Sequence, residues 1–340
     1  MFTNLVELIK SMPDEQTCRN YVAEQRWGVG RVVCPYCESE RAYVIEGGKR
    51  YKCAERMCYK KFSVTVGTFM EDSNIPVSKW LIGIYLVLSA KKGISSYQLG
   101  RQLGIAQKNS WFLLHRIRQI LTPDEYDVLE GTIEIDETYM GRKYRSRYVG
   151  LEPEVVEELT HAEKTNKIKT KGAVVGLIQR DGKAIVKAID AITKDNIVEV
   201  VKQHVSKENS RLMTDESRLY VKGLKDYERE TVCHYKREWK KGKDIHINTI
   251  EGFWSVMKRG VHGIYHHVSA KHLQAYCSEF VYRYNHRKIS DSARFALSLQ
   301  GLKGRLTYNE LTSEKEAPKK YDLTDLKTAV KRYNYGRRDT

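Results

Sequence analysis

Four cysteines in two close pairs constrain the fold of this chain more than any other feature. Cys34 and Cys37 form a C-x2-C pair, and after fifteen residues Cys53 and Cys58 form a C-x4-C pair. Four thiolates grouped in this way suit a closed tetrahedral zinc site, which has a structural role because no coordination position stays open. So small a module buries little apolar surface and depends on the metal to fold. We predict a zinc ribbon over residues 31–70.

The other cysteines and the charge balance bear on compartment and partner. Cys18, Cys233 and Cys277 are scattered, which argues against a disulfide framework and for a reducing compartment. The chain has 59 Lys and Arg against 43 Asp and Glu, a net charge of +16 that favours a polyanionic partner. Because neither a membrane-spanning apolar run nor a signal peptide is visible, we expect a cytoplasmic, nucleoid-associated protein.

Helical patterns flank the ribbon. Residues 1–30 predict two short helices around Pro13. Residues 71–130 predict an apolar helix, a short helix capped by Ser95, a break at Gly104 and a basic helix from about Gln107. This order is typical of a helix-turn-helix, with a plain three-helix linker as the alternative. The basic side chains that we expect to face DNA from the last helix are Lys108, Arg116 and Arg118.

The segment 131–290 alternates strands and helices and predicts an α/β domain with an insertion at about 142–171. GTIEIDETYMG predicts a strand with Asp136 near its end, and SRLMTDES predicts a later strand that ends at Asp215. The stretch 244–263 predicts a helix on which Glu251 and Lys258 lie two turns apart on one face. An amphipathic helix with a solvated charged stripe is the alternative for this stretch alone.

Strand ends and the helices that cover them converge at one edge of an α/β sheet. Three carboxylates that meet there, Asp136, Asp215 and Glu251, repel one another unless cations bridge them. Mg²⁺ (or Mn²⁺) binds few carboxylates and also takes phosphate oxygens, and two such ions support in-line displacement at phosphorus. Further basic residues are expected to contact DNA just before the helix that carries Glu251 and near its end. They are Lys236, Arg237, Lys240, Lys241, Lys243 and Arg259.

These residues carry a resemblance to a known family. IEIDETYMG, MTDES and HINTIEGFWSVMKRG are similar to the DDE motif segments of insertion-sequence transposases with a ribonuclease H-like core, and YCSEFVYRYNHRK resembles the end of that catalytic domain. The cysteine ribbon and the helices after it resemble the N-terminal part of a zinc-ribbon subgroup. The resemblance implies catalytic roles for Asp136, Asp215, Glu251 and Lys258. Some relatives use Asn as the third ligand, so Asn248 is the alternative to Glu251, or a helix cap.

The resemblance implies a DNA transposase that binds double-stranded DNA at terminal inverted repeats, cleaves there with two metal ions and joins the 3′-OH ends to target DNA, as a homodimer or larger. Two alternatives stay open: a ribonuclease H-like nuclease without strand transfer, and a zinc-ribbon regulator that binds DNA without cleaving it. Residues 291–340 are expected to form a helix followed by a weakly ordered basic extension. The expected fold is therefore α/β: a mixed sheet with helices, preceded by a zinc ribbon and a helix-turn-helix-like segment.

Overall fold

The computed structural model describes residues 2–140, 172–233, 240–242, 244–302 and 304–313, so the expected insertion and most of the C-terminal extension lie outside the described residues. The chain divides into two compact units, Met1–Arg305 and Leu306–Thr340. In the second unit, Thr307 and Glu310 form a capping box at the start of the short helix α13 (Tyr308–Thr312). All features below belong to the first unit.

The two expected N-terminal helices are present as α1 (Leu5–Ser11) and α2 (Glu15–Trp27). Asn4 and Asp14 cap them, because their side-chain oxygens accept hydrogen bonds from backbone N–H groups of the first turn. A side chain of α2 also caps a neighbouring helix, since the Glu15 carboxylate accepts hydrogen bonds from the first two backbone N–H groups of α3 (Val77–Ser89).

The ribbon follows α2 as a three-stranded antiparallel sheet in the order β1 (Ala42–Ile45), β2 (Arg50–Cys53) and β3 (Lys61–Phe62). A short 3₁₀ turn (Glu46–Gly48) joins β1 to β2, and Gly47 and Gly48 have positive φ there. Tyr51 and Phe62 stack on one face of this sheet and pack edge-on against Trp27, so this face is fixed to α2.

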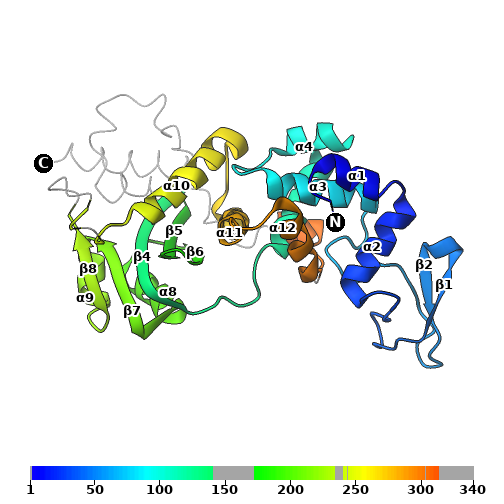
Figure 1. The fold of residues 1–340 in the computed structure, drawn as a ribbon, viewed down its shortest axis with the longest axis horizontal. Helices are drawn as coiled ribbons and strands as arrows, with labels where there is room; N and C mark the ends of the chain where they lie inside the picture. The colour runs from blue at the N-terminus through cyan, green and yellow to red at the C-terminus, as the bar shows by residue number, and fades with distance from the viewer. Residues whose placement is uncertain (1, 141–171, 234–239, 243, 303, 314–340) are drawn as a thin grey trace, which may run out of the picture. The chain divides into compact units, whose positions relative to one another are not determined.

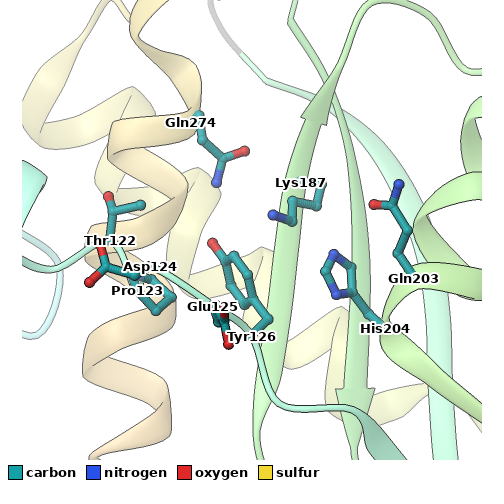
Figure 2. Close-up of a pocket in the computed structure, with 9 residues that line it drawn as sticks. All are labelled: Thr122, Pro123, Asp124, Glu125, Tyr126, Lys187, Gln203, His204 and Gln274. Atoms are coloured by element: carbon teal, nitrogen blue, oxygen red, sulfur yellow. The ribbon is translucent and has the colours of Figure 1, made fainter.

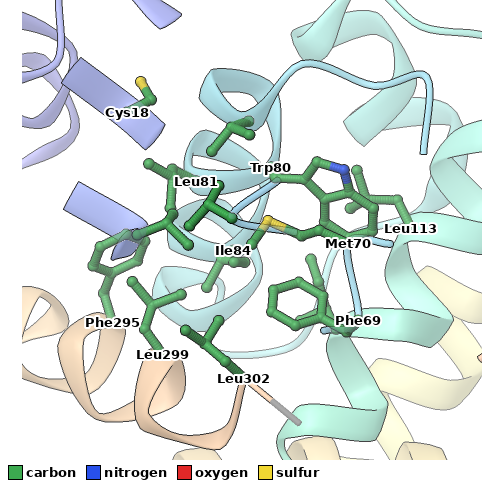
Figure 3. Close-up of a cluster of buried hydrophobic side chains, with 14 of the residues drawn as sticks. Cys18, Phe69, Met70, Trp80, Leu81, Ile84, Leu113, Phe295, Leu299 and Leu302 are labelled. Atoms are coloured by element: carbon green, nitrogen blue, oxygen red, sulfur yellow. The ribbon is translucent and has the colours of Figure 1, made fainter. Parts of the chain in front are cut away.

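The expected helix-turn-helix elements are α4 (Ser96–Leu103), capped by Ser95, and α5 (Gln107–Ile120). Gly104 ends α4 in the left-handed region, a conformation that costs glycine little. The helix α12 (Asp291–Ser298) and the 3₁₀ turn after it (Leu299–Gly301) lie late in the sequence but pack against these N-terminal helices. Phe295, Leu299 and Leu302 join the buried core of Trp80, Leu81, Ile84 and Leu113 (Figure 3). This helix is therefore part of the N-terminal core.

The segment after α5 forms a five-stranded mixed sheet in the order β6-β5-β4-β7-β8. The first three strands along the chain, β4 (Leu129–Met140), β5 (Gly172–Gln179) and β6 (Ala184–Ile189), form an antiparallel meander. Then β7 (Val205–Asp215) and β8 (Glu228–Val232) add parallel to β4 and to each other. The mixed sheet confirms the expected α/β class, whereas the sequence reasoning missed β8.

Helices cover both faces of this sheet (Figure 1). On one face, α8 (Lys194–His204) and α9 (Arg218–Gly223) pack on Ile133, Ile135 and Leu212. On the other face, α10 (Asn248–Gly260) and α11 (Ala270–Asn285) pack on Val174, Val186 and Met213. The alternation of the strands thus feeds two separate cores, and α10 lies on the face to which Glu134 and Asp136 point.

Candidate active site

Asp136 and Asp215 are brought together by the pairing of β4 with β7. The parallel register ends with Glu134 opposite Met213, and Asp136 and Asp215 each lie two residues further along their strands, near enough for their charges to interact. Asp215 ends its strand as expected. Asp136 does not, because β4 continues to Met140 through its pairing with β5. The pair therefore lies where one strand ends beside another that runs on.

We define the acid cluster as Asp136, Glu137 and Asp215. Two of its carboxyl groups have raised pKa values. Burial, and then the nearby Glu137 and Asp215, raise the pKa of Asp136 to about 7. Burial also raises the pKa of Glu137, although the Tyr220 hydroxyl donates to its carboxylate and opposes the shift. Carboxylates that disfavour one another's charge in this way suit a divalent cation, which would remove the repulsion.

Helix α10 contacts the acid cluster through Trp254. The buried indole donates a hydrogen bond from Nε1 to Asp136 Oδ2 over 3.0 Å. Glu251 lies one turn before Trp254 and is half-buried, so the helix that carries it lies against Asp136. Within the described residues, however, Asp136, Asp215 and Glu251 do not form a group whose ligand atoms all lie within 4.8 Å of one another. Asn248 is exposed on the same helix.

A residue that the sequence reasoning missed, Glu134, holds the start of α10. Its side chain on β4 is fully buried and accepts hydrogen bonds from Thr249 Oγ1 and from the Ile250 backbone N–H, both over 2.9 Å. The helix has no capping side chain of its own, since Asn248 is its first helical residue and Ile247 precedes it. The expected alternative role of Asn248 as the cap is therefore wrong, because Glu134 supplies the acceptor from another strand.

Arg180 binds the same carboxylate, and we call Glu134 and Arg180 together the anchor of α10. Its Nε lies 2.9 Å from Glu134 Oε1, and its terminal nitrogens donate to the backbone carbonyls of Asp244 and His246. The His246 ring lies beside the same pair, with Nδ1 at 3.3 Å from Glu134. The only sequence signal for the anchor was an acid in an alternating strand, and the spacing alone could not show that a helix start would bury it.

The four ribbon cysteines form the one group of metal-ligating side chains recorded among the described residues. The Sγ atoms of Cys34 and Cys58 lie 3.8 Å apart and those of Cys37 and Cys53 lie 3.5 Å apart. Tetrahedral sulfur ligands at about 2.3 Å from a zinc ion lie about 3.8 Å from one another. The donor set and its spacing thus fit Zn²⁺.

The residues expected to contact DNA differ in how far they are exposed to solvent. The exposed ones are Lys108, Lys240, Lys241 and Arg259, while Lys258 is half-buried. Lys236, Arg237 and Lys243 lie outside the described residues. The expectation that Arg116 and Arg118 face outward is wrong, since they are 3% and 1% exposed. Arg116 donates to the carbonyls of Phe69 and Glu71.

Arg118 is part of a buried charge network. Its Nε lies 2.7 Å from Glu279 on α11, and its guanidinium lies over the rings of Tyr265 and Tyr276. Arg283 pairs with the same carboxylate over 2.6 Å. Arg118 therefore joins α5 to α11, and within α5 only the first turn, with Lys108, is exposed to solvent.

A cavity of about 470 Å³ lies between the segment 122–126, β6 and the end of α8. In Figure 2, Tyr126, Lys187 and His204 face one another across it, and the Lys187 ammonium lies 3.9 Å from the centre of the Tyr126 ring. None of the expected catalytic acids lines this cavity, so the acid cluster is a separate feature.

A mixed sheet with two neighbouring aspartates, a covering helix and a preceding cysteine ribbon are the features expected of a DNA-processing enzyme of the DDE class. Two family models match the chain: the transposase zinc-ribbon domain over residues 13–61 and the ISXO2-like transposase domain over residues 128–285. The matches together span more than half of the chain, which belongs to this family of zinc-ribbon DDE transposases with a ribonuclease H-like fold. No curated protein matches it. No described helix is long and apolar enough to cross a membrane.

Proposed function

We propose that this transposase binds the terminal inverted repeats of its own insertion sequence, cleaves at the transposon ends and joins the freed 3′-OH ends to target DNA. The carrying observation is the acid cluster with the raised pKa of Asp136, just beyond the paired residues of β4 and β7. Asp136, Asp215 and Glu251 would hold Mg²⁺ or Mn²⁺, which supplies activation of the attacking oxygen and stabilisation of the leaving oxygen.

The chain's own residues prepare this site. Trp254 fixes one oxygen of Asp136, and the Glu134–Arg180 anchor fixes the first turn of the helix that carries Glu251. Lys258, two turns further along α10, would hold a phosphate beside the carboxylates. Water first displaces the 3′ oxygen at the transposon end, and the resulting 3′-OH then displaces a 3′ oxygen in the target, so each step breaks one phosphodiester bond.

DNA recognition is proposed for α4 and the first turn of α5. Within α5, the exposed side chains are confined to this turn, at Gln107, Lys108 and Asn109. A recognition helix contacts base edges with its N-terminal residues, so this turn is the part that would enter the major groove. Because both ends of the element must be held together, the active form is proposed to be a homodimer or larger assembly acting on chromosomal or plasmid DNA in the cytoplasm.

The test is Mg²⁺-dependent cleavage of a duplex that carries the end of the element, with Asp136→Asn and Asp215→Asn beside the wild type. Glu208→Gln, an exposed acid on the same strand as Asp215, is the matched control. We expect both Asn variants to lose about 10²-fold or more in rate, because metal stabilisation is worth several kcal/mol. Full activity in Asp136→Asn would reject the proposal.

The same assay separates the third ligand and the reaction type. If Glu251 is the ligand, Glu251→Gln loses activity as Asp136→Asn does, and Asn248→Ala retains most of it. The opposite order would assign the role to Asn248. Precut ends with a free 3′-OH test joining to target DNA, and cleavage without joining would instead assign a nuclease.

A further inference from the structure

The zinc ribbon carries a lysine and tyrosine surface on the side of its sheet opposite to α2. Register fixes this side: Tyr43 pairs with Lys52 and Lys52 pairs with Lys61, so the three side chains point the same way. Tyr51 and Phe62 alternate with them and pack on Trp27. We define the outer face of the ribbon by these three residues together with Tyr59, whose ring Lys52 contacts, and with Tyr36 and Lys60, which contact each other beside the two cysteine pairs.

The aromatic residues of the outer face are open to solvent. Tyr36, Tyr43 and Tyr59 are 47%, 53% and 51% exposed. Tyr36 lies inside the first cysteine pair and Tyr59 directly follows the second pair, so the zinc site sets their positions. Large exposed aromatics gathered on one small module indicate an interaction surface.

Two of the lysines of this face lie over two of those rings. Lys60 Nζ lies 4.4 Å from the centre of the Tyr36 ring, and Lys52 Nζ lies 5.7 Å from that of Tyr59. Such contacts restrict the long lysine side chains before any partner binds. Because an ammonium group already lies over each of these two rings, Tyr36 and Tyr59 are occupied platforms for stacked bases.

Three arginines of the ribbon form ion pairs, whereas none is recorded among the described residues for the lysines of the outer face. Three of its glutamates are paired with arginines: Glu40 with Arg31, Glu46 with Arg50 and Glu55 with Arg41. Across the described residues, no carboxylate is recorded within 4 Å of Lys52, Lys60 or Lys61. Lys52 and Lys61 even stand directly opposite each other, an arrangement that costs a sheet stability unless an anion relieves it.

We propose that the outer face of the ribbon grips the phosphate backbone of duplex DNA and contributes affinity without reading sequence. The inference deepens the proposed function, on which it rests, by dividing the work within the N-terminal half. The ribbon supplies counterion-releasing phosphate contacts, and the α4–α5 turn supplies base contacts. Aromatic side chains that carry a cation at a fixed position suit a regular row of phosphates better than the unstacked bases of a single strand.

The experiment measures the affinity of the zinc-loaded full chain for two duplexes, one with the element end and one of scrambled sequence, across a salt series. Lys52→Ala/Lys61→Ala is compared with Lys202→Ala/Lys207→Ala, an equal charge change at exposed positions of α8 and β7. The ribbon variant is expected to fold and bind zinc normally, because it removes two opposed cations.

The loss of two phosphate contacts makes the negative slope of log K against log salt shallower by about 1.8. Binding at 0.1 M salt is then weaker by on the order of tens of fold. We expect this loss to be equal for both duplexes. An unchanged slope, or a loss confined to the element end, would overturn the proposal. Cleavage is assayed separately: a chain that cleaves but shows an unchanged slope fails this inference only, and an inactive chain with the expected slope change fails the proposed reaction only.

Discussion

Glu134 is the residue whose replacement should most clearly separate this account from a simpler one. Its carboxylate is fully buried and has three partners at 2.9 Å: Thr249 Oγ1, the Ile250 N–H and Arg180 Nε. Glu134→Ala leaves Arg180 without its counter-charge and the start of α10 without an acceptor, which we expect to cost about 3–5 kcal/mol of unfolding free energy. Glu134→Gln keeps one oxygen for the Ile250 N–H, and about 1–3 kcal/mol is expected.

The measurement pairs denaturant unfolding with hydrogen exchange. Glu130→Ala, an exposed glutamate on the same strand, is the control and should stay within about 0.5 kcal/mol of the wild type. The Ile250 amide should exchange faster in Glu134→Ala than in the control. Cleavage should fall while most of the DNA affinity is kept, since the anchor acts on α10 and not on the ribbon or on α4 and α5. Equal unfolding free energies for both alanine variants, with an unchanged Ile250 amide, would refute the reasoning.

Three further predictions follow from other parts of the structure. The pKa of Asp136 is raised from 3.8 to about 7, so its contribution to stability is full below pH 3.8 and is lost as the pH rises through 7. Without added Mg²⁺, Asp136→Asn, which can still accept from Trp254, should therefore have a higher Tm than the wild type at pH 8 and no advantage at pH 4; equal Tm values at pH 8 would contradict this. Zinc removal by a chelator should unfold the ribbon and leave the mixed sheet intact, as circular dichroism and limited proteolysis would show, whereas an unchanged ribbon would mean that the metal is dispensable. Burial opposes the charge of Glu279, but Arg283 and Arg118 hold its pKa at about 2, so its stabilisation is present above pH 4.5 and fades as the pH falls towards 2; Glu279→Gln should lower the unfolding free energy at pH 7 by about 3–5 kcal/mol, and a loss below about 1 kcal/mol would show that the network is not essential.

Local patterns in the sequence were sufficient for much of the fold. The cysteine spacing, the Ser95 cap and the Gly104 break each act through neighbours in the chain, and the structure has the ribbon and both helices there. The proximity of Asp136 and Asp215 could also be expected, because alternation and strand ends indicate which residues share an edge of the sheet.

What the sequence could not give depends on contacts between distant segments. Arg116 and Arg118 look like the solvated face of a basic helix until carbonyls of residues 69 and 71 and the Glu279 carboxylate bury them. Glu134 looks like an exposed strand acid until α10 begins above it. In both cases tertiary packing decides between solvent and a buried partner, and neither periodicity nor composition contains that information.

The central claim is that one divalent-cation site joins β4, β7 and α10. The most direct measurement is a crystal structure of the chain with Mn²⁺, whose anomalous signal locates the ion independently of the protein atoms. The account predicts an ion in contact with both Asp136 and Asp215, and Glu251 or Asn248 completing the site from α10. An ion bound elsewhere, or an α10 that turns both of these side chains away from the aspartates, would contradict it.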